Sequence, residues 1–349
     1  MLPYGRQDIT QADIDAVIEV LQSDFLTQGP VVPLFEEAIA KKVGARHAVA
    51  TNSATSALHL ACLALGLGPG DRLWTSTISF VASANCGLYC GANVDFVDID
   101  PRSYNLCPDA LARKLETAKL SGQLPKIVVA VHLCGQPCDM AAIHRLSIQY
   151  GFAIIEDASH AIGGRYRGRP IGSCDFSDIT IFSFHPVKII TTAEGGMAVT
   201  NSKALHNTME LLRSHGITRD PTQMTHEPHG PWYYQQIALG FNYRMTELQG
   251  ALGLSQLERL DQYVERRHDL AERYDRLLSD LPVTRPWQSP DSYSGRHLYV
   301  VRVKLDVADR SHVFSSLRAQ HIGVNLHYIP IHTQPYYTSL GFKEGDFPN

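Results

Sequence analysis

The sequence has no long apolar run, no excess of basic residues and no segment typical of a secretory leader. No stretch approaches the roughly 18 consecutive apolar residues that a membrane-spanning helix needs. The N-terminal segment MLPYGRQDIT contains no apolar core of signal-peptide length. A formal net charge of −4 provides no positive field for nucleic acid. These absences predict a cytoplasmic protein with neither a nucleic-acid partner nor a membrane.

Cysteine pairs of the CxxC type are also missing. The seven cysteines include two CxxxC pairs, Cys86/Cys90 and Cys134/Cys138, and His132 lies beside the second pair. A structural zinc site usually requires CxxC spacing and a second pair elsewhere. An odd number of cysteines in a chain without a leader argues against a disulfide framework. Because free cysteine is among the most buried residue types, we expect reduced thiols in the core and no metal site.

What the sequence does have is an ordinary globular composition, with 44% hydrophobic and 19% charged residues over 349 positions. This length suffices for one large core and a smaller appended domain. Short apolar, β-rich runs alternate with helical patterns, which is typical of an α/β fold with a mainly parallel sheet between helices. The predicted strands are 47–51, 71–76, 94–97, 126–133, 152–155, 179–184 and 197–199, and the predicted helices are 56–65, 80–89, 108–118 and 140–150.

The pattern changes near residue 245. A capping box begins at Thr246, and leucines then recur at helical spacing as far as Leu281, which predicts one long helix or two helices joined near Arg266. A strand at 297–304 and a helix at 311–320 should follow.

We therefore expect a large domain over residues 1–245 and a smaller α+β domain over residues 246–349. No closing strand or helix precedes Asn349, so the smaller domain is expected to lack its final elements.

Three polar clusters follow predicted strands, at the edge where ligands bind in open α/β sheets. Residues 51–56 (TNSATS) open a helix and would suit a phosphate, although an N-cap with turn residues explains them equally well. Residues 156–160 (EDASH) offer carboxylates for a metal, a ribose or a protonated ring nitrogen, with His160 as either a ligand or a packing residue. Residues 182–188 (FSFHPVK) end in a lysine, which is either solvated or, if buried, a nucleophile with a lowered pKa.

The three clusters are more informative together than singly. Pyridoxal phosphate requires a phosphate cradle, a carboxylate facing its ring nitrogen, an aromatic face and a Schiff-base lysine. Ala54 with Thr55, Asp157, Phe80 and Lys188 supply these features in that order. The combination predicts a pyridoxal-phosphate enzyme.

From residue 3 to about residue 343 the sequence resembles the DegT/DnrJ/EryC1/StrS sugar aminotransferases, which have the fold of aspartate aminotransferase (fold type I). The resemblance implies a pyridoxal-phosphate-binding large domain and a smaller α+β C-terminal domain. The matching segments include LTQGPVVPLFEEAIA, NSATSALHLA, SFVASANC, VVAVHLCGQPCDM, IIEDASHAIGG, FSFHPVKIITTAEGG, LGFNYRMTELQGALGLSQL and NLHYIPIHTQPYY.

The resemblance assigns catalytic roles to three residues. Lys188 falls on the lysine that forms the Schiff base and moves the proton. Asp157 matches the carboxylate that keeps the ring nitrogen protonated, and His160 lies where relatives carry Gln or His against the ring or its 3-hydroxyl.

The resemblance also implies a cofactor shell and a substrate site. Asn242 matches an asparagine that reaches the phosphate from the neighbouring subunit, which implies a homodimer with shared active sites. The remaining cofactor residues are Ala54 (through its backbone), Thr55 and Ser183 at the phosphate and Phe80 on the ring. The nucleotide-sugar site would be lined by Tyr4, Asp24, Phe25, Leu26, Thr27, Asn325, His327 and Tyr328.

The sequence departs from the family pattern at a few positions. Ala193 stands where relatives usually have Gly in TTGEGG, and Ala54 replaces the Gly of the commoner SGT form. The sugar dehydratases of the family carry His in place of the lysine, so Lys188 argues against that activity.

The expected reaction moves the amino group of L-glutamate to the C4 ketone of a UDP-linked 4-keto-6-deoxy sugar. Segments such as NSATSALH and CGQPCDM most resemble family members that act in pseudaminic acid synthesis. A bacillosamine precursor, a UDP-4-keto-pentose and a dTDP-4-keto-6-deoxyhexose stay open as substrates. A regulatory protein that binds pyridoxal phosphate without turnover is the alternative from another functional class.

Overall fold

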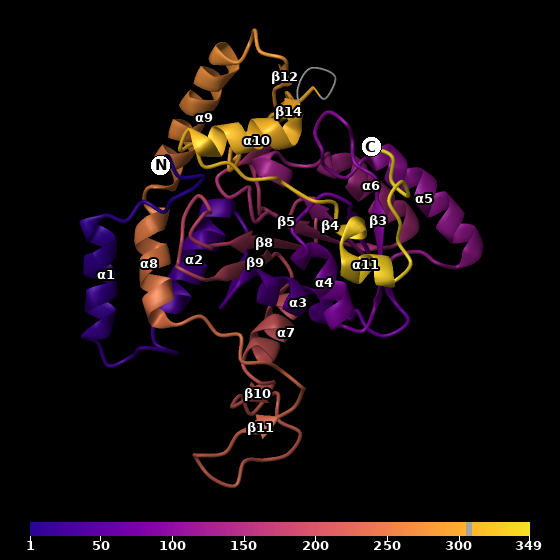
Figure 1. Cartoon of the computed structure of the whole chain (residues 1–349). Coiled ribbons are helices and arrows are strands. Elements are labelled where there is room, and N and C mark those ends of the chain that lie inside the picture. The colour runs from indigo at the N-terminus through magenta and orange to yellow at the C-terminus, as the bar shows by residue number, and fades with distance from the viewer. Residues whose placement is uncertain (305–308) are drawn as a thin grey trace.

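The computed structural model describes residues 1–304 and 309–349, and its centre is a seven-stranded sheet (Figure 1). Neighbouring strands pair in parallel in the order β3 (Asn93–Val97), β2 (Arg72–Ser76), β4 (Ile127–Val131), β5 (Ala153–Asp157) and β8 (Ile179–Ser183). By contrast, β9 (Gly196–Thr200) runs antiparallel to both β8 and β1 (His47–Thr51). Every strand except β9 therefore ends at the same edge, and the predicted α/β class with a mainly parallel sheet is confirmed. In spatial order the strands are β1, β9, β8, β5, β4, β2 and β3.

Helices cover both faces of this sheet, which explains why its strands are apolar without alternation. In β4, for example, Val128 packs into the core on one face and Val129 into the core on the other. The same alternation sends Ile154 and Ile155 of β5 to opposite faces. The first face is covered by α2 (Val31–Val43), α5 (Pro108–Ser121) and α6 (Met140–Tyr150), and the second by α3 (Ala54–Ala64), α4 (Ala82–Tyr89) and α7 (Lys203–Arg213).

The helical region after residue 245 is divided at a different point from the one predicted. α8 (Glu247–Leu257) begins with the predicted capping box, in which the Thr246 N–H donates to the side chain of Gln249 (2.9 Å). α9 (Leu260–Leu277) follows a break at Glu258 and Arg259, not near Arg266. At this break the Arg259 guanidinium donates to the carboxylate of Asp13 (2.7 Å), so an ion pair with the N-terminal helix accompanies the change of direction.

The strand predicted at 297–304 is wrong over most of its length, because only Arg302–Val303 (β14) pair as a strand. The segment before β14 uses its backbone differently. The Gly295 N–H donates to the Gly135 carbonyl (3.0 Å), and the Leu298 N–H donates to the Cys134 carbonyl (3.3 Å). The chain is thereby bonded to the 3₁₀ turn Leu133–Gly135 instead of to a neighbouring strand.

Short elements complete the described residues. The helix predicted at 311–320 is present as α10, and the division into domains at residues 245 and 246 stays a prediction. The remaining elements of the described residues are α1 (Gln11–Leu21), β6 (Arg165–Tyr166), β7 (Arg169–Pro170), β10 (Ile217–Thr218), β11 (Gln235–Gln236), β12 (Val283–Thr284), β13 (Ser292–Tyr293), α10 (Arg310–Ala319), α11 (Pro335–Ser339) and the 3₁₀ turns Leu133–Gly135 and Ile331–Thr333.

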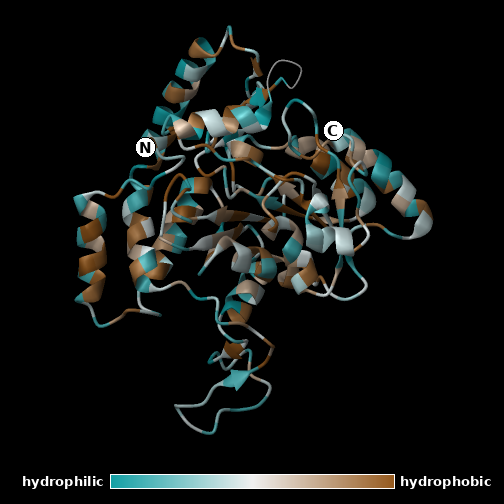
Figure 2. Cartoon of the chain, in the orientation of Figure 1, coloured by the Kyte–Doolittle hydropathy of each residue, from teal (hydrophilic) through white to brown (hydrophobic). Residues whose placement is uncertain are grey.

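Both ends of the chain are held by contacts with other segments of the protein. The N-terminus is held by residues 321–323, since Leu2 accepts from the Gly323 N–H and donates to the His321 carbonyl (2.8 Å each). Near the other end, Tyr337 packs on Phe96 of β3 with 5.5 Å between ring centroids. Figure 2 shows apolar residues along the central strands and their covering helices. Of the helices in the described ranges, none combines the length and apolar character required to cross a bilayer.

We expect Phe96→Ala to lower the free energy of unfolding by about 3–5 kcal/mol, because it empties a fully buried site under the C-terminal segment. Urea unfolding measures this change, and limited proteolysis should show earlier cleavage within residues 331–349. Leu120→Ala, at a side chain that is 91% exposed, serves as the control and should change stability by less than about 0.5 kcal/mol. An equal effect of both substitutions would contradict the packing described.

Candidate active site

Lys188 lies in the loop that joins β8 to β9. The loop is closed at its base by the Phe184 N–H, which donates to the Gly195 carbonyl (2.9 Å), and the Lys188 N–H donates to the His185 carbonyl (2.8 Å). The side chain is partly buried, and this burial lowers the pKa of Lys188 to about 8, although the negative charge of Asp157 opposes the shift. A large fraction of the amine is therefore unprotonated in mildly alkaline solution.

Asp157 ends β5 beside β8, where it pairs in register with Ile181. Its side chain is buried, with 5% exposed, and both of its carboxylate oxygens accept hydrogen bonds. Ser83 on α4 donates through Oγ to Oδ2 (2.6 Å), and the Ser159 N–H donates to Oδ1 (3.1 Å). Each oxygen retains a lone pair for a further donor.

The helix that follows β1 provides a cradle for an anion. Ser53 caps α3 by accepting from the Ser56 N–H (3.1 Å). Within residues 1–304 and 309–349, the N–H groups of Ala54 and Thr55 have no protein acceptor. These two free donors lie at the positive end of the helix dipole, which is the arrangement that binds phosphate.

Close packing of β9 against this helix start completes the cradle. A Cβ atom on Gly196 would lie 2.5 Å from the Ala54 nitrogen, so only glycine permits the approach. Gly196 pairs with Ser183 of β8, whose side chain is buried and whose hydroxyl has no partner within the described ranges. The structure thus brings Ala54, Thr55 and Ser183 to one place, as the sequence-based hypothesis required.

His160 lies beneath the same edge and is neutral. Burial, followed by the charge of Lys188, holds its pKa well below the usual value. Its Nδ1 accepts from the Cys134 N–H (3.2 Å), so the hydrogen-bond network assigns the proton to Nε2, which lies 3.3 Å from the Tyr328 hydroxyl. His160 can therefore donate a hydrogen bond through Nε2.

Two of the predicted substrate segments meet beside Lys188. The Tyr4 hydroxyl lies 2.6 Å from Nε2 of His327, and the two rings stack with 5.3 Å between centroids. Burial raises the pKa of Tyr4 to about 12, whereas burial and the charge of Lys188 lower the pKa of His327 to about 4. Tyr4, His327 and Tyr328 therefore form a wall of neutral aromatic side chains.

His297 belongs to this group and was missed in the sequence analysis. Its ring centroid lies 4.4 Å from that of His160, it is 6% exposed, and burial together with the Lys188 charge lowers its pKa well below the usual value. No motif points to it, because the sequence pattern predicts a strand there. Only the docking of residues 295–298 on the turn at Cys134 brings it here.

The other predicted site residues lie outside the group formed by Tyr4, His160, His297, His327 and Tyr328. Phe80 lies just before Val81, the N-cap of α4, and is 60% exposed, so its ring is free to cover a ligand. Asp24, Phe25, Leu26 and Thr27 are exposed and lie against the start of α8, where the Leu26 carbonyl accepts from the Glu247 N–H (3.1 Å). Asn325 is exposed as well, and the side chain of Asn242 points to solvent while its carbonyl accepts from Asn52 (3.4 Å).

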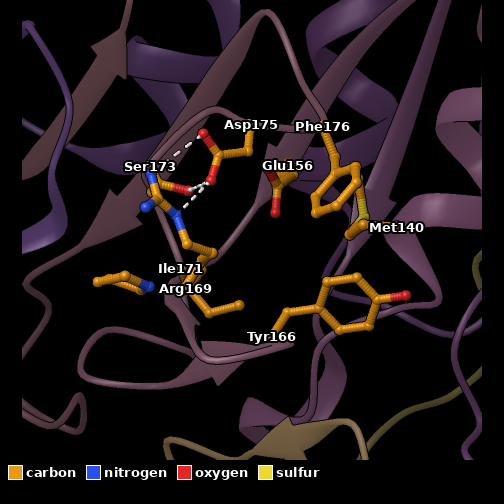
Figure 3. A pocket seen from close by; sticks show the side chains of 10 residues that line it. Met140, Glu156, Tyr166, Arg169, Ile171, Ser173, Asp175 and Phe176 are labelled. Carbon is orange, nitrogen blue, oxygen red and sulfur yellow. Dashed lines mark hydrogen bonds and ion pairs between the residues drawn. The ribbon is translucent and has the colours of Figure 1, made fainter.

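A small cavity on the opposite face of β5 is separate from this site (Figure 3). Glu156, the neighbour of Asp157, points into it, because successive strand residues face opposite sides. Arg169 and Asp175 pair at its rim (2.8 Å). With a volume near 10 Å³, the cavity has room for about one water molecule, so it does not serve as a substrate site.

The seven cysteines are free thiols, and Cys62, Cys86, Cys90 and Cys138 are buried. Over residues 1–304 and 309–349, no three His, Cys, Asp or Glu side chains are arranged to hold a metal ion. Ala193, at the family's usual glycine position, adopts a positive φ of 65°. This left-handed conformation explains why glycine is preferred there.

The residues fit pyridoxal phosphate by their own chemistry. The unpaired N–H groups of Ala54 and Thr55 would hold the phosphate, Asp157 has lone pairs left for a ring nitrogen, and Lys188 has an amine of lowered pKa. A seven-stranded sheet of this topology with these groups at its edge defines a pyridoxal-phosphate-dependent aminotransferase of fold type I.

Comparison with known proteins gives the family. The family model described as the DegT/DnrJ/EryC1/StrS aminotransferase family matches residues 7–349, and the chain belongs to this family of nucleotide-sugar aminotransferases. The spore coat polysaccharide biosynthesis protein SpsC of Bacillus subtilis (strain 168) is 40% identical over 353 residues, covering 100% of this chain and 88% of that protein. The UDP-4-amino-4,6-dideoxy-N-acetyl-beta-L-altrosamine transaminase of Campylobacter jejuni subsp. jejuni serotype O:23/36 (strain 81-176) is 39% identical over 342 residues, covering 97% and 87%.

Solved structures agree with this assignment. PseC of Helicobacter pylori, an aminotransferase involved in the biosynthesis of pseudoaminic acid, superposes with a TM-score of 0.87 at 33% identity and covers 97% of this chain and 88% of that chain. Spr1654 of Streptococcus pneumoniae in its PLP-form superposes with a TM-score of 0.88 at 28% identity, covering 99% and 90%. The expected fold type, enzyme class and cofactor are thereby confirmed.

Because burial lowers the pKa of Lys188 to about 8, its amine should react with an acylating reagent at lower pH than an ordinary lysine. Acetylation of the apoprotein, read at peptide level by mass spectrometry, should increase with pH with a midpoint near 8. In Asp157→Asn the midpoint should fall further, since the Asp157 charge raises the pKa of Lys188. A midpoint near 10.5, the ordinary value, would contradict the burial of this amine.

Proposed function

We propose that this aminotransferase moves the amino group of L-glutamate to the C4 ketone of UDP-2-acetamido-2,6-dideoxy-β-L-arabino-hex-4-ulose. The products would be 2-oxoglutarate and UDP-4-amino-4,6-dideoxy-N-acetyl-β-L-altrosamine. The Campylobacter jejuni relative supports this choice by its name and by 39% identity, and the Helicobacter pylori structure supports it at 33% identity.

A different nucleotide-linked 4-keto sugar is the second candidate. SpsC, at 40% identity, is as similar to the chain as the altrosamine transaminase, and its name places it in spore coat polysaccharide biosynthesis. A bacillosamine precursor, a UDP-4-keto-pentose or a dTDP-4-keto-6-deoxyhexose would use the same amine chemistry with different contacts at the sugar.

The observation that carries the proposal is the partly buried amine of Lys188, with its pKa of about 8, beside the carboxylate of Asp157. When bound, pyridoxal phosphate supplies an electron sink that makes the Cα proton of an amino acid acidic. Lys188 is the base that takes this proton, because its amine is partly free near neutral pH. Asp157 would hold the ring nitrogen, and His160 would donate through Nε2 to an oxygen on the ring.

The remaining predicted residues are assigned to the phosphate, to the face of the ring and to the sugar. The Ala54 and Thr55 backbone and the Ser183 hydroxyl would hold the phosphate, with Phe80 covering the ring. Tyr4, His327 and Tyr328 form the side of the cleft that the nucleotide sugar would contact, and the proposed sugar site also includes Asp24, Phe25, Leu26, Thr27 and Asn325.

A homodimer with shared sites is part of the proposal. The segment that carries β10 and β11 projects from the body of the molecule (Figure 1), and its apolar side chains are exposed, with Trp232 at 70% and Leu239 at 81%. Asn242 lies at the base of this arm with an exposed side chain. An arm of this kind fits contact with a second copy, which would bring Asn242 to the partner's phosphate cradle.

Glutamate should bleach the visible absorbance of the purified holoprotein, and mass spectrometry should find an amino sugar after incubation with the preferred nucleotide sugar. A screen with L-glutamate would compare the altrosamine precursor with the three other classes of sugar. Lys188→Ala should lower turnover by roughly 10²–10⁴-fold, because it removes the base. Lys203→Ala, on the exposed surface of α7, is the matched control.

The outcomes separate the rival functions. Bleaching without a product from the altrosamine precursor, and with a product from another sugar, would select the second candidate. A protein that binds the cofactor but neither bleaches with glutamate nor forms any product would be a regulatory protein, and the enzymatic proposal would be abandoned.

The shared site can be tested with hybrid dimers. A subunit with Lys188→Ala and a subunit with Asn242→Ala should each form weakly active or inactive homodimers. Their hybrid should regain activity, because one of its two sites combines an intact lysine with an intact asparagine from the other subunit. If Asn242 serves its own subunit, both sites of the hybrid are defective and no activity returns.

A further inference from the structure

Two buried serines near the start of α4 have no role in the assignments above: Ser83 bonds to Asp157, and Ser79 bonds to Ser83. Ser83 is fully buried, and its Oγ lies 2.6 Å from Oδ2 of Asp157. Ser79, with 3% exposed, places its own Oγ 2.9 Å from that of Ser83. The two hydroxyls therefore form a chain that leads from the turn to the carboxylate.

The direction of this chain follows from donor and acceptor chemistry. An ionised carboxylate only accepts hydrogen bonds, so the single Ser83 proton must point to Asp157. The Ser83 oxygen is then free to accept, and Ser79 is its donor. Donation by Ser79 strengthens the bond that Ser83 makes to the carboxylate, since hydrogen bonds in a chain polarise one another.

The same turn also carries Phe80, the exposed aromatic residue at the cleft. The Ser83 N–H donates to the Phe80 carbonyl (3.3 Å), which fixes one residue relative to the other. Just before the turn, the Thr77 carbonyl accepts from the Ile331 N–H (2.8 Å), so the segment after Tyr328 is attached to it. One short stretch, residues 77–83, thus contains Phe80 and is bonded both to the carboxylate of Asp157 and to Ile331.

We infer that Ser83, supported by Ser79, is a positioning residue that sets the orientation of the Asp157 carboxylate toward the ring nitrogen of the cofactor. The inference rests on the proposed roles of Asp157 and Phe80. With Oδ2 bonded to Ser83 and Oδ1 to the Ser159 N–H, the carboxylate cannot rotate without breaking a bond. Its remaining lone pairs then face a fixed direction, in which they would accept from the ring nitrogen of the cofactor.

A purely structural role for the serines makes a different prediction. If the hydroxyls only stabilise the start of α4, their removal should weaken every ligand of the cleft equally, whether or not that ligand has a ring nitrogen. If they orient Asp157, the loss should depend both on that nitrogen and on the carboxylate.

The test measures dissociation constants by equilibrium dialysis for pyridoxal phosphate and for its 1-deaza analogue, which lacks the ring nitrogen. Ser83→Ala should bind pyridoxal phosphate about 10-fold more weakly than the unaltered protein, the size expected for one charge-assisted hydrogen bond. Ser79→Ala should show a smaller loss. Ser76→Ala, at a buried serine that donates to the Ile78 carbonyl instead (3.3 Å), is the matched control and should bind normally.

Two comparisons make the result specific. For the deaza analogue, Ser83→Ala should bind as the unaltered protein does. In a double-mutant cycle, Ser83→Ala should cause no further loss once Asp157→Asn is present. Ser83→Cys leaves no cavity, since its side chain is slightly larger than that of serine, but it replaces the hydroxyl by a weak donor. It should therefore resemble Ser83→Ala, and it carries the test if the alanine variant does not fold.

Normal binding of pyridoxal phosphate by Ser83→Ala, or an equal loss for both ligands, would overturn the inference. Failure of the proposed function looks different. In that case the unaltered protein would not bind pyridoxal phosphate, or Asp157→Asn would bind it as tightly as the unaltered protein.

Discussion

The rest of the site depends on the burial of the Lys188 amine, because burial makes its positive charge unfavourable. Lys188 sits partly out of water, and burial outweighs the attraction of Asp157, so its pKa is about 8. The groups around it do not add charge. His160 and His297 are kept neutral by burial and by the lysine itself, and Tyr4 and Tyr328 have raised pKa values. Among the described residues, the site therefore combines the amine of Lys188 and the carboxylate of Asp157 with neutral side chains around them.

This placement requires the topology of the sheet. Since every strand except β9 ends at one edge, the loop after β8, the end of β5 and the helix start after β1 meet there although they are far apart in sequence. β9 alone runs the other way, and it enters beside the cradle through Gly196, where a side chain would collide with the backbone of Ser53 and Ala54. The antiparallel strand β9 thus packs against the start of α3 and closes that side of the anion cradle.

The strands and the groups at their ends could be predicted from the sequence because both depend on local pattern. Buried strands such as β4 are continuous apolar runs, and polar residues that follow such runs fall at the ligand edge. His297, Ser79 and Ser83 could not be found in this way. His297 and Ser83 each contact a residue distant in the chain, and Ser79 bonds to Ser83. The turn at Cys134 and Gly135, which bonds to the backbone beside His297, also replaces the strand predicted at 297–304. The break at Glu258 and Arg259 likewise depends on a partner, Asp13, from the first helix.

The pair of acids at the end of β5 shows what the structure adds to the motif. Glu156 and Asp157 are adjacent and both carry a carboxylate, yet strand alternation sends them to opposite faces. The carboxylate of Glu156 already has partners within the protein, because it bonds to His132 (2.7 Å), Ser177 and Thr180. Burial opposes its ionisation, but these bonds lower its pKa. Asp157 receives only one donor on each oxygen. Because a buried carboxylate needs its lone pairs satisfied, the one that the protein leaves incomplete is the one that a ligand can complete.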